Sequence, residues 1–444
     1  MAATPPPAAA ARATWREWQL IFTLTLIYML SFVDRGTLNL IVNPLQHDLG
    51  IDDLQMSLLL GLSFAALYSV LSVPAGHLAD HVSRRLMIAV AVVFWSMTTI
   101  LCGLAGNYWQ LFAGRVGLGV GEAALPPAAY SMLRDGVSVE RRGRAFSIYQ
   151  AGLTLGTGLG AMIGGALYAS AEHGTFATWP LLAGLKPWQV VIVVPGFGGI
   201  LLAFLLLTLR EPPRGAPVPA SAASFGEMFR HVGRNWRLYG PIFGAVTAIS
   251  FTGGGWSAWL PAVIGRMWGL SPAVIGHRLG LIGLTVFPIS ALAIGWLMDV
   301  ARRRGRSGGP FQVSLIACLL NVAPALGVLL APSVDTMWIS YAGSILFSSG
   351  VQIACGIMLA NVTPGHLMGK VTAFYYLTAN LIGLGVGVTF YAGVARLFFA
   401  GPGALRTALL VCYPGGMALT ILLLALGIAA ARRETRLSSF SQNT

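Results

Sequence analysis

Charged side chains are scarce in this chain of 444 residues. Asp, Glu, Lys and Arg together make up 10% of the sequence, whereas a soluble domain carries about a quarter. So few charges exclude an ordinary soluble protein. Hydrophobic residues supply 56% of the chain, and this composition predicts an integral membrane protein.

Cysteine and metal-binding patterns are also lacking. The four cysteines all fall within apolar runs, and they are Cys102, Cys318, Cys355 and Cys412. Their positions fit neither a disulfide framework nor a metal site, so we interpret them as small buried residues. No pair of histidines has the H-E-x-x-H spacing of a zinc enzyme. We therefore expect no metal, no cofactor and no enzymatic activity.

Acidic residues are fewer than basic ones, 15 against 28, which gives a net charge of +13. A basic excess can indicate nucleic-acid binding, but no soluble domain is present to carry a basic patch, so we exclude that partner. Instead, 21 of the 28 basic residues flank one side of the apolar runs and only five flank the other. The positive-inside rule then places both termini in the cytoplasm. Arginine far outnumbers lysine, which favours a GC-rich bacterial genome and a cell inner membrane.

Long apolar runs fill most of the chain. Each is long enough for the ~20 residues of a membrane-spanning helix. The runs are continuous, unlike the alternating segments of a membrane β-barrel. They lie approximately at 18–43, 54–79, 85–106, 109–134, 144–170, 188–210, 238–264, 272–300, 311–331, 336–361, 366–399 and 404–431. We predict an all-α integral membrane protein with twelve transmembrane helices.

A linker separates the first six runs from the last six. It begins with the Pro- and Ala-rich segment EPPRGAPVPASAAS, after which apolar residues recur at helical spacing opposite three arginines. This pattern predicts a helix at the membrane interface, with a disordered linker as the alternative. The predicted divisions are an N-terminal bundle at 1–210, a cytoplasmic linker at 211–237, a C-terminal bundle at 238–431 and a cytoplasmic tail at 432–444.

The two halves repeat a motif at the end of their second span. In the first half Gly76, Asp80, Arg84 and Arg85 belong to the segment G-H-L-A-D-H-V-S-R-R, and Gly295, Asp299 and an arginine run repeat it. Such a six-plus-six repeat resembles the major facilitator superfamily. Its loop signature usually has Arg and Gly where this chain has His81 and Ser83. The resemblance assigns a gating role to Gly76, Asp80, Arg84, Arg85, Arg144 and Asp299.

Four charged residues lie within the predicted spans. Asp34 and Arg35 are adjacent in span one, and Arg115 and Glu122 lie two helical turns apart in span four. Charges at membrane depth are costly and usually functional. The segment R-V-G-L-G-V-G resembles a motif of proton-coupled members of the superfamily. We predict that these four residues couple protons and bind a substrate headgroup. A static ion network that fixes spans one and four is the alternative.

Several motifs resemble the spinster-like branch of the superfamily. They are Tyr28 with Asp34-Arg35, Gly121-Glu122-Ala123 with Pro126-Pro127, Asp135 with Arg142 and Arg144, and Leu209-Arg210-Glu211-Pro212. The resemblance implies a charged amphiphile as substrate, such as a lysophospholipid or sphingolipid. The competing resemblance is to proton symporters of small organic anions such as sugar acids, which share the Asp-Arg and Gly-x-x-Glu-Ala-Pro patterns. Their usual W-F-P is absent here.

Aromatic and polar residues of the spans are candidates for the substrate cavity. The C-terminal half has no intramembrane acid, so proton chemistry is expected in the N-terminal half. Taken singly, each candidate fits a helix-packing residue better than a substrate contact. The predicted cavity residues are Tyr28, Asn39, Trp256, Trp259, Gln352, Tyr375, Tyr376 and Asn380. We expect a monomer among membrane lipids that moves its substrate by alternating access, with proton loading on Asp34 or Glu122 biasing the equilibrium.

Overall fold

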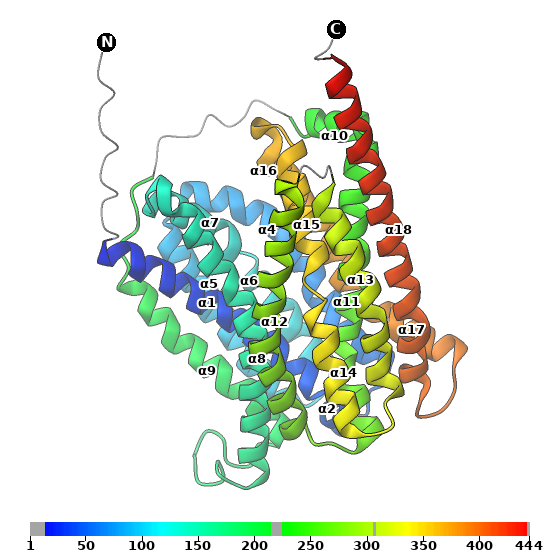
Figure 1. The fold of residues 1–444 in the computed structure, drawn as a ribbon. Coiled ribbons are helices and arrows are strands. Elements are labelled where there is room, and N and C mark those ends of the chain that lie inside the picture. Colours follow the sequence, from blue (N-terminus) through cyan, green and yellow to red (C-terminus); the bar gives the residue numbers. More distant parts are fainter. Residues whose placement is uncertain (1–13, 215–223, 305–307, 442–444) are drawn as a thin grey trace.

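The computed structural model describes residues 14–214, 224–304 and 308–441, and in these ranges it contains helices and no strands. Nearly all of the helices run in one direction or its reverse, as a bundle (Figure 1). The linker residues 215–223 and tail residues 442–444 of the predicted divisions lie outside the described ranges.

The N half comprises the helices before the linker. They are α1 (Trp15–Leu40), α2 (Val42–Leu49), α3 (Asp53–Ser57), the π-helical turn η1 (Leu58–Leu62), α4 (Ser63–His81), α5 (Arg84–Gly103), α6 (Tyr108–Glu122), α7 (Leu125–Gly136), the 3-10 turn η2 (Val139–Arg141), α8 (Arg142–Glu172) and α9 (Pro187–Leu207).

The C half begins with a short helix, α10 (Phe225–Arg234). The helices after it are α11 (Trp236–Trp268), α12 (Pro272–Arg303), α13 (Gly309–Leu330), α14 (Val334–Leu346), α15 (Gly350–Val362), α16 (Gly365–Thr378), the π-helical segment η3 (Ala379–Val386), α17 (Gly387–Phe398) and α18 (Ala404–Ser441).

Twelve spans result when consecutive helices are joined, as the sequence predicts. Ten helical stretches of the described chain are each long and apolar enough to cross a membrane. The other two spans are α6 with α7 and the long helix α11. Span four is broken between α6 and α7 because Pro126 and Pro127 cannot donate backbone hydrogen bonds and so begin a new helix. The expected all-α architecture is confirmed.

The helix ends follow local sequence rules. Thr14 begins α1 with a capping box, in which its side chain accepts from the Glu17 amide and the Glu17 carboxylate accepts from the Thr14 amide. Asp52 and Gln55 repeat the same arrangement at the start of α3. Gly269 ends α11 with a positive φ of 64°, a conformation that glycine adopts without strain.

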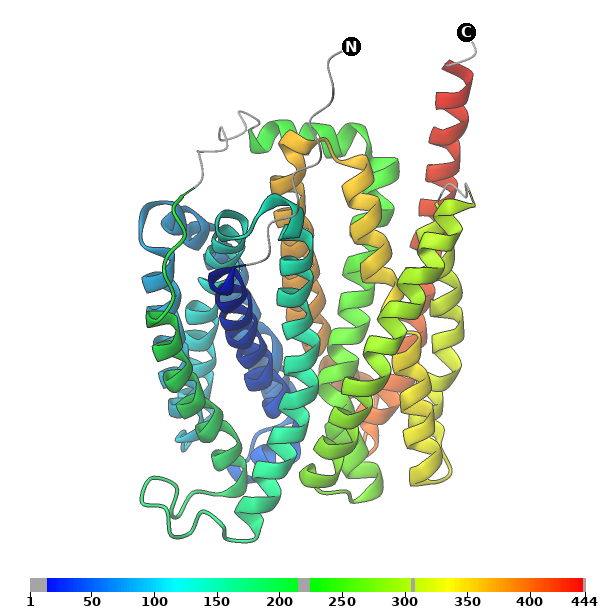
Figure 2. The same cartoon turned by 60° about the vertical axis from the view of Figure 1, so that its left-hand side comes forward.

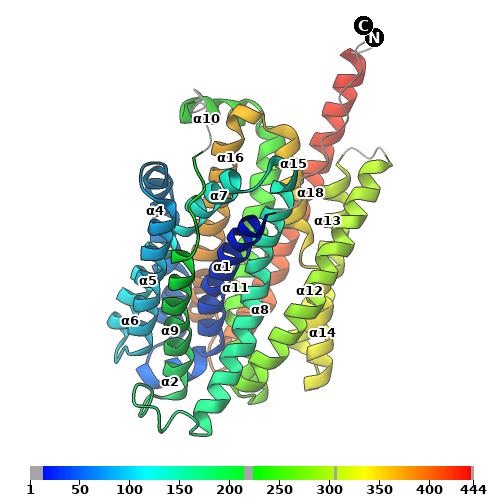
Figure 3. The ribbon, with the colours of Figure 1, turned by 90° about the vertical axis from the view of Figure 1, so that its left-hand side faces the viewer.

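The two halves stand side by side, with α10 lying across the spans at one end (Figure 2). We call this the α10 end, and the opposite end, where α2 lies, the α2 end. On one side α8 packs along α12 (Figure 3). Glycines make this seam close: a Cβ at Gly165 would lie 2.9 Å from the Ala273 carbonyl oxygen.

Candidate functional site

The structure brings the four intramembrane charges together from α1 and α6. Arg35 of α1 forms an ion pair and hydrogen bond with the carboxylate of Glu122 on α6. The Arg35 side chain is 20% exposed and that of Glu122 only 1%. Next to Glu122, α6 packs closely on α5, since a Cβ at Gly121 would lie 2.8 Å from the Trp95 Cβ.

Three aromatic rings surround the Arg35 guanidinium. Its central carbon lies 4.3 Å from the ring centre of Phe64, 4.6 Å from Phe32 and 5.2 Å from Tyr68. Aromatic faces attract cations at such distances. None of the three rings is among the residues predicted from the sequence. Their only signal is that Phe64 and Tyr68 lie four residues apart, on the same face of α4.

Asp34 contacts α5 of the N half. Its residue is 6% exposed, and one carboxylate oxygen lies 3.5 Å from the Thr99 hydroxyl on α5. That hydroxyl donates a shorter bond of 2.9 Å to the Trp95 carbonyl. Within the described chain, the other Asp34 oxygen and one Glu122 oxygen are buried without a hydrogen-bond partner. Both acids are therefore incompletely hydrogen-bonded, which is costly for a buried polar group.

Arg115 has a different environment from Arg35. It is 4% exposed, and its Nε donates to the backbone carbonyl of Leu59 at 3.0 Å. No carboxylate of the described ranges lies within ion-pair distance of it. Arg115 is thus a buried cation held by a backbone carbonyl.

A cavity of about 90 Å³ opens beside both arginines, which is room for about three water molecules. Its lining joins the two halves. Residues of the N half include Arg35, Asn39, Tyr68 and Arg115, and those of the C half include Gly254, Ser257 and Asn380. Of the eight predicted cavity residues, Asn39 and Asn380 line this space.

The other predicted cavity residues lie elsewhere. Tyr28 stacks on Tyr149 at 4.4 Å between ring centres. Trp256 packs against Tyr413, and the Trp259 indole donates to the Val388 carbonyl. Tyr375 is buried, whereas Gln352 and Tyr376 are exposed.

The predicted gating residues lie at the α10 end. Arg84 is buried, and its guanidinium binds the carboxylates of Asp135 and Glu211 and the Pro212 carbonyl. Arg85 donates to the Leu209 carbonyl at 2.8 Å. The other predicted gating residues are more exposed. Asp80 and Arg144 are exposed, Gly76 is half-buried, and Asp299 forms an ion pair with Arg302 on its own helix.

Glu211 fastens the start of the linker to this cluster. Partial burial raises the pKa of its carboxyl, but hydrogen bonds from the Ser83 hydroxyl and from Arg84 outweigh burial and hold the pKa below its usual range. In the sequence Glu211 contributes only to the family resemblance, because its contacts depend on the fold.

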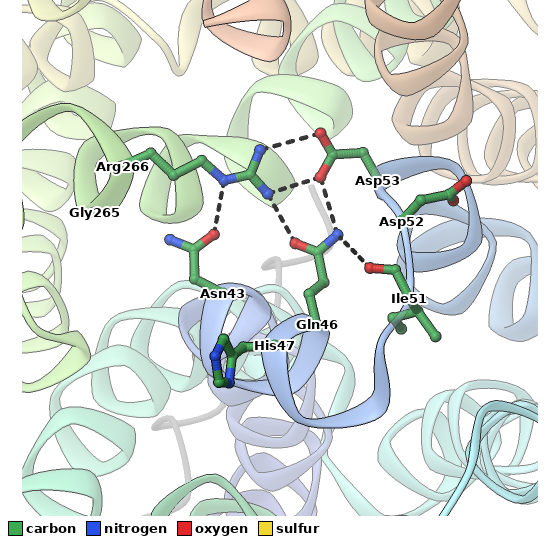
Figure 4. A pocket seen from close by; sticks show the side chains of 8 residues that line it. All are labelled: Asn43, Gln46, His47, Ile51, Asp52, Asp53, Gly265 and Arg266. Carbon is green, nitrogen blue, oxygen red and sulfur yellow. Dashed lines mark hydrogen bonds and ion pairs between the residues drawn. The ribbon is translucent and has the colours of Figure 1, made fainter. Parts of the chain in front are cut away.

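At the α2 end, polar side chains join the two halves. Figure 4 shows Asn43, Gln46 and Asp53 of the N half turned toward Arg266 of α11. Arg266 donates to both oxygens of Asp53, at 2.7 and 3.1 Å. It also donates to Gln46 at 2.8 Å and to Asn43 at 2.9 Å. These residues line an open pocket of about 520 Å³.

A second ion pair at the α2 end joins Arg396 to Asp52 at 3.2 Å. In the described ranges, the ion pairs at the α10 end each stay within one half or join α10 to α16. Among the described residues, the ion pairs that join the two halves therefore lie at the α2 end.

A bundle of twelve spans with a buried acid–base cluster at the boundary of two halves defines a multi-pass membrane transporter. A family model described as the Major Facilitator Superfamily matches residues 24–388. The chain belongs to this superfamily, whose members are transporters and not enzymes, and it resembles the spinster homologues.

Individual relatives agree with this classification. Human protein spinster homolog 1 is 27% identical over 391 residues, which cover 83% of this chain and 71% of the human protein. The probable L-galactonate transporter of Escherichia coli is 25% identical over 250 residues, covering 53% of this chain and 51% of that protein. A solved bacterial homologue of the human lysosomal transporter Spinster, inward-facing and unoccupied, has a TM-score of 0.79 at 25% identity, covering 95% of this chain and 98% of that one.

Proposed function

We propose that this protein is a proton-coupled secondary transporter of a charged amphiphile. The observation that carries the proposal is the ion pair between Arg35 and Glu122 beside a cavity shared by both halves. Burying an ion pair at membrane depth costs free energy, so such pairs usually have a function. Asp34 lies next to it with one carboxylate oxygen unpartnered.

Protonation of Glu122 would remove one charge of the pair and leave Arg35 free to bind an anion. An anionic headgroup at Arg35 would in turn favour the neutral form of Glu122, because both compete for the same guanidinium. Substrate and proton binding are then linked through one side chain, and linkage of this kind is reciprocal. Asp34 is the second candidate carrier of the proton.

The substrate class is inferred from the spinster-type resemblance, which implies a lysophospholipid or sphingolipid. The rings around Arg35 provide an apolar wall beside a cation, as an amphiphile requires. A small organic anion such as a sugar acid is the second candidate. The polar lining by Asn39, Ser257 and Asn380 favours it, as does the similarity to a probable L-galactonate transporter.

The orientation follows from the basic residues, which gather at the α10 end. We propose that this end is cytoplasmic, that both termini lie there, and that the protein is a monomer of the cell inner membrane. The halves are clasped at the α2 end, so the structure then corresponds to an inward-facing state. The bundles at 1–210 and 238–431 would rock against each other, with the motif around Asp80 and Arg84 as the cytoplasmic gate.

Transport by purified protein in liposomes tests the proposal. A pH gradient should drive movement of a lysophospholipid, and Asp34→Asn and Glu122→Gln should each reduce this gradient-driven transport at least tenfold, because a neutral amide cannot carry the proton. Asp335→Asn, which neutralises an exposed acid at the start of α14, is the matched control. Full gradient-driven transport in both site variants would refute proton coupling here.

A thermal-shift panel tests the substrate class. Lysophospholipids, sphingolipids and sugar acids are each added to the purified protein, and the unfolding temperature is recorded. We expect the amphiphiles to raise it, because a ligand that binds the folded state alone stabilises it. Stabilisation by sugar acids but not by lipids would instead support the organic-anion alternative. The same panel on Arg35→Gln should lose the effect.

A further inference from the structure

Span two contains a π-helical turn beside the cavity. This turn, η1, includes Leu60 and Gly61, which line the cavity. The Ser63 amide donates to the carbonyl of Leu58, five residues back, and not to that of Leu59, four residues back. The Leu59 carbonyl therefore loses the partner that an α-helix would give it.

Two side chains bind this released carbonyl. The Ser63 hydroxyl donates to it at 3.0 Å, and Arg115 Nε donates to it at 3.0 Å from α6. Leu59 is fully buried, so without these donors its carbonyl would be a polar group in apolar surroundings. Arg115 in turn has no carboxylate within ion-pair distance among the described residues. The Leu59 carbonyl and the Arg115 guanidinium are thus hydrogen-bond partners of each other.

The turn also sets the position of the rings that hold Arg35. Phe64 and Tyr68 follow it directly on α4, and both stack on the Arg35 guanidinium. A π-helical turn contains one residue more than the α-helix that would replace it. Closing the turn would rotate the residues after it by about 100°, because an α-helix has 3.6 residues per turn. That rotation would carry both rings away from Arg35.

We propose that Arg115 is a positioning residue that keeps the π-helical turn open and thereby holds the aromatic rings on Arg35. This inference rests on the proposed function, in which Arg35 binds the substrate. It gives the two buried arginines separate roles: Arg35 contacts Glu122 and the cavity, while Arg115 fixes the helix that shapes the Arg35 site.

The turn also touches the C half. The segment η3 contacts both η1 and α4, so two π-helical segments meet at the boundary between the halves. A Cβ at Gly385 would lie 3.3 Å from the Cβ of Ala65, close to the roughly 3.5–4.5 Å that a disulfide requires. The pair Ala65→Cys with Gly385→Cys therefore reports on the orientation of α4 just after the turn.

Disulfide formation in the full-length chain tests the proposal. Cys412→Ser removes the partly exposed native cysteine. With Ser63 and Arg115 intact, a mild oxidant should link positions 65 and 385 rapidly. Arg115→Met should slow this linkage by roughly tenfold, since a hydrogen bond from a charged donor shifts an equilibrium by about that factor. Ser63→Ala should slow it less, and Arg115→Lys should retain it, because the ammonium can still donate to Leu59.

A control pair verifies folding in each variant. Gly327→Cys with Ser340→Cys joins α13 to α14, where a Cβ at Gly327 would lie 3.2 Å from the Ser340 Cβ. An unchanged linkage rate in Arg115→Met with the control pair intact would overturn the proposal. If Arg115→Met does not fold, Ser63→Ala decides the matter, since an unchanged rate there would also overturn it. The readout needs neither substrate nor proton gradient, so failure of the proposed transport function is separately visible.

Discussion

Arg35 is held by aromatic faces as well as by charge. A buried ion pair barely repays the loss of hydration of its two charges. Each ring over a guanidinium contributes about 0.5–2 kcal/mol without requiring a second charge. When Glu122 is neutral, the rings of Phe32, Phe64 and Tyr68 still position the guanidinium. The proposed protonation of Glu122 would therefore change the charge of the site while the rings keep Arg35 in place.

Replacing one aromatic side chain with an aliphatic one tests this role. Phe64→Leu removes the nearest aromatic face, and we expect it to lower the free energy of unfolding by about 1–2 kcal/mol and to weaken substrate binding. Thermal unfolding and the KM of transport measure the two effects. Phe204→Leu, which replaces an exposed aromatic side chain of α9, should change neither the free energy of unfolding nor the KM. Equal effects in the two variants would contradict a specific role for Phe64.

The sequence reveals charged residues of this site more readily than aromatic ones. Asp34, Arg35, Arg115 and Glu122 can be recognised because charges are rare in apolar runs. Phe64 and Tyr68 resemble any other packing residues, and only the contact between α1 and α4 shows what they face. The contact between Arg115 and Leu59 is likewise invisible in sequence, because one partner is a backbone carbonyl.

At the scale of elements, the start of the linker is fastened to the ends of α5 and α7 through Arg84. Glu211 contributes to this junction as a carboxylate, because its pKa is held below the usual range. A carboxyl group whose pKa is lowered in the folded state stabilises that state at pH values above the ordinary pKa of about 4.3. That contribution is lost as the pH falls through the lowered pKa.

A pH series on the purified protein tests this junction. Between pH 7 and pH 3 the unfolding temperature of the unmodified protein should fall. The unfolding temperature of Glu211→Gln should fall less, because an amide cannot be protonated in this range. Glu140→Gln, at an exposed position near the same end, is the matched control and should follow the unmodified protein. Identical pH profiles for Glu211→Gln and the unmodified protein would argue against the ionic junction.

Helix positions are largely predictable, while breaks within a span are less so. The apolar runs match the observed helices because a span must satisfy its own backbone in lipid. The π-helical turns η1 and η3 contain no proline, and at η1 the donor to the released carbonyl comes from Arg115 on a neighbouring helix. Span four illustrates both cases: its apolar run was predicted as one helix, whereas Pro126 and Pro127 divide it.

For the whole molecule, the Arg266 cluster favours the state that is closed at the α2 end. Arg266 is bound by three side chains of the other half, and a bidentate pair with a carboxylate is among the stronger polar contacts. Opening that end must break these contacts together with the pair between Arg396 and Asp52. The cluster should therefore shift the equilibrium between the two open states.

Spin labels across the α2 end measure this shift. Labels at His47→Cys and Val274→Cys report the distance between the N half and α12. Arg266→Ala should increase the population with the longer distance about tenfold, since a hydrogen bond to a charged group contributes about 1.5–3 kcal/mol and such contacts hold the α2 end closed. Arg278→Ala, an exposed arginine of α12, is the control. No change in the distance distribution of Arg266→Ala would show that the cluster does not hold this end.

The two-half architecture follows from the sequence, but the side at which the halves hold together does not. The internal repeat and the linker indicate two bundles, whereas Arg266 and Asp53 are ordinary charges near span ends until the fold joins them. Which end is closed depends on the conformation, so it cannot be predicted from the sequence.

The glycine seam between α8 and α12 has a mechanical consequence. Where Gly165 faces Gly276, a Cβ on Gly276 would lie 2.3 Å from the Ala161 carbonyl oxygen, and backbone atoms cannot change rotamer to absorb a displacement. A tilt of one half must therefore pass directly to the other along this line. The seam would serve as a common axis of rotation, and a single added methyl group at Gly276 would act as a wedge that fixes the angle between the halves.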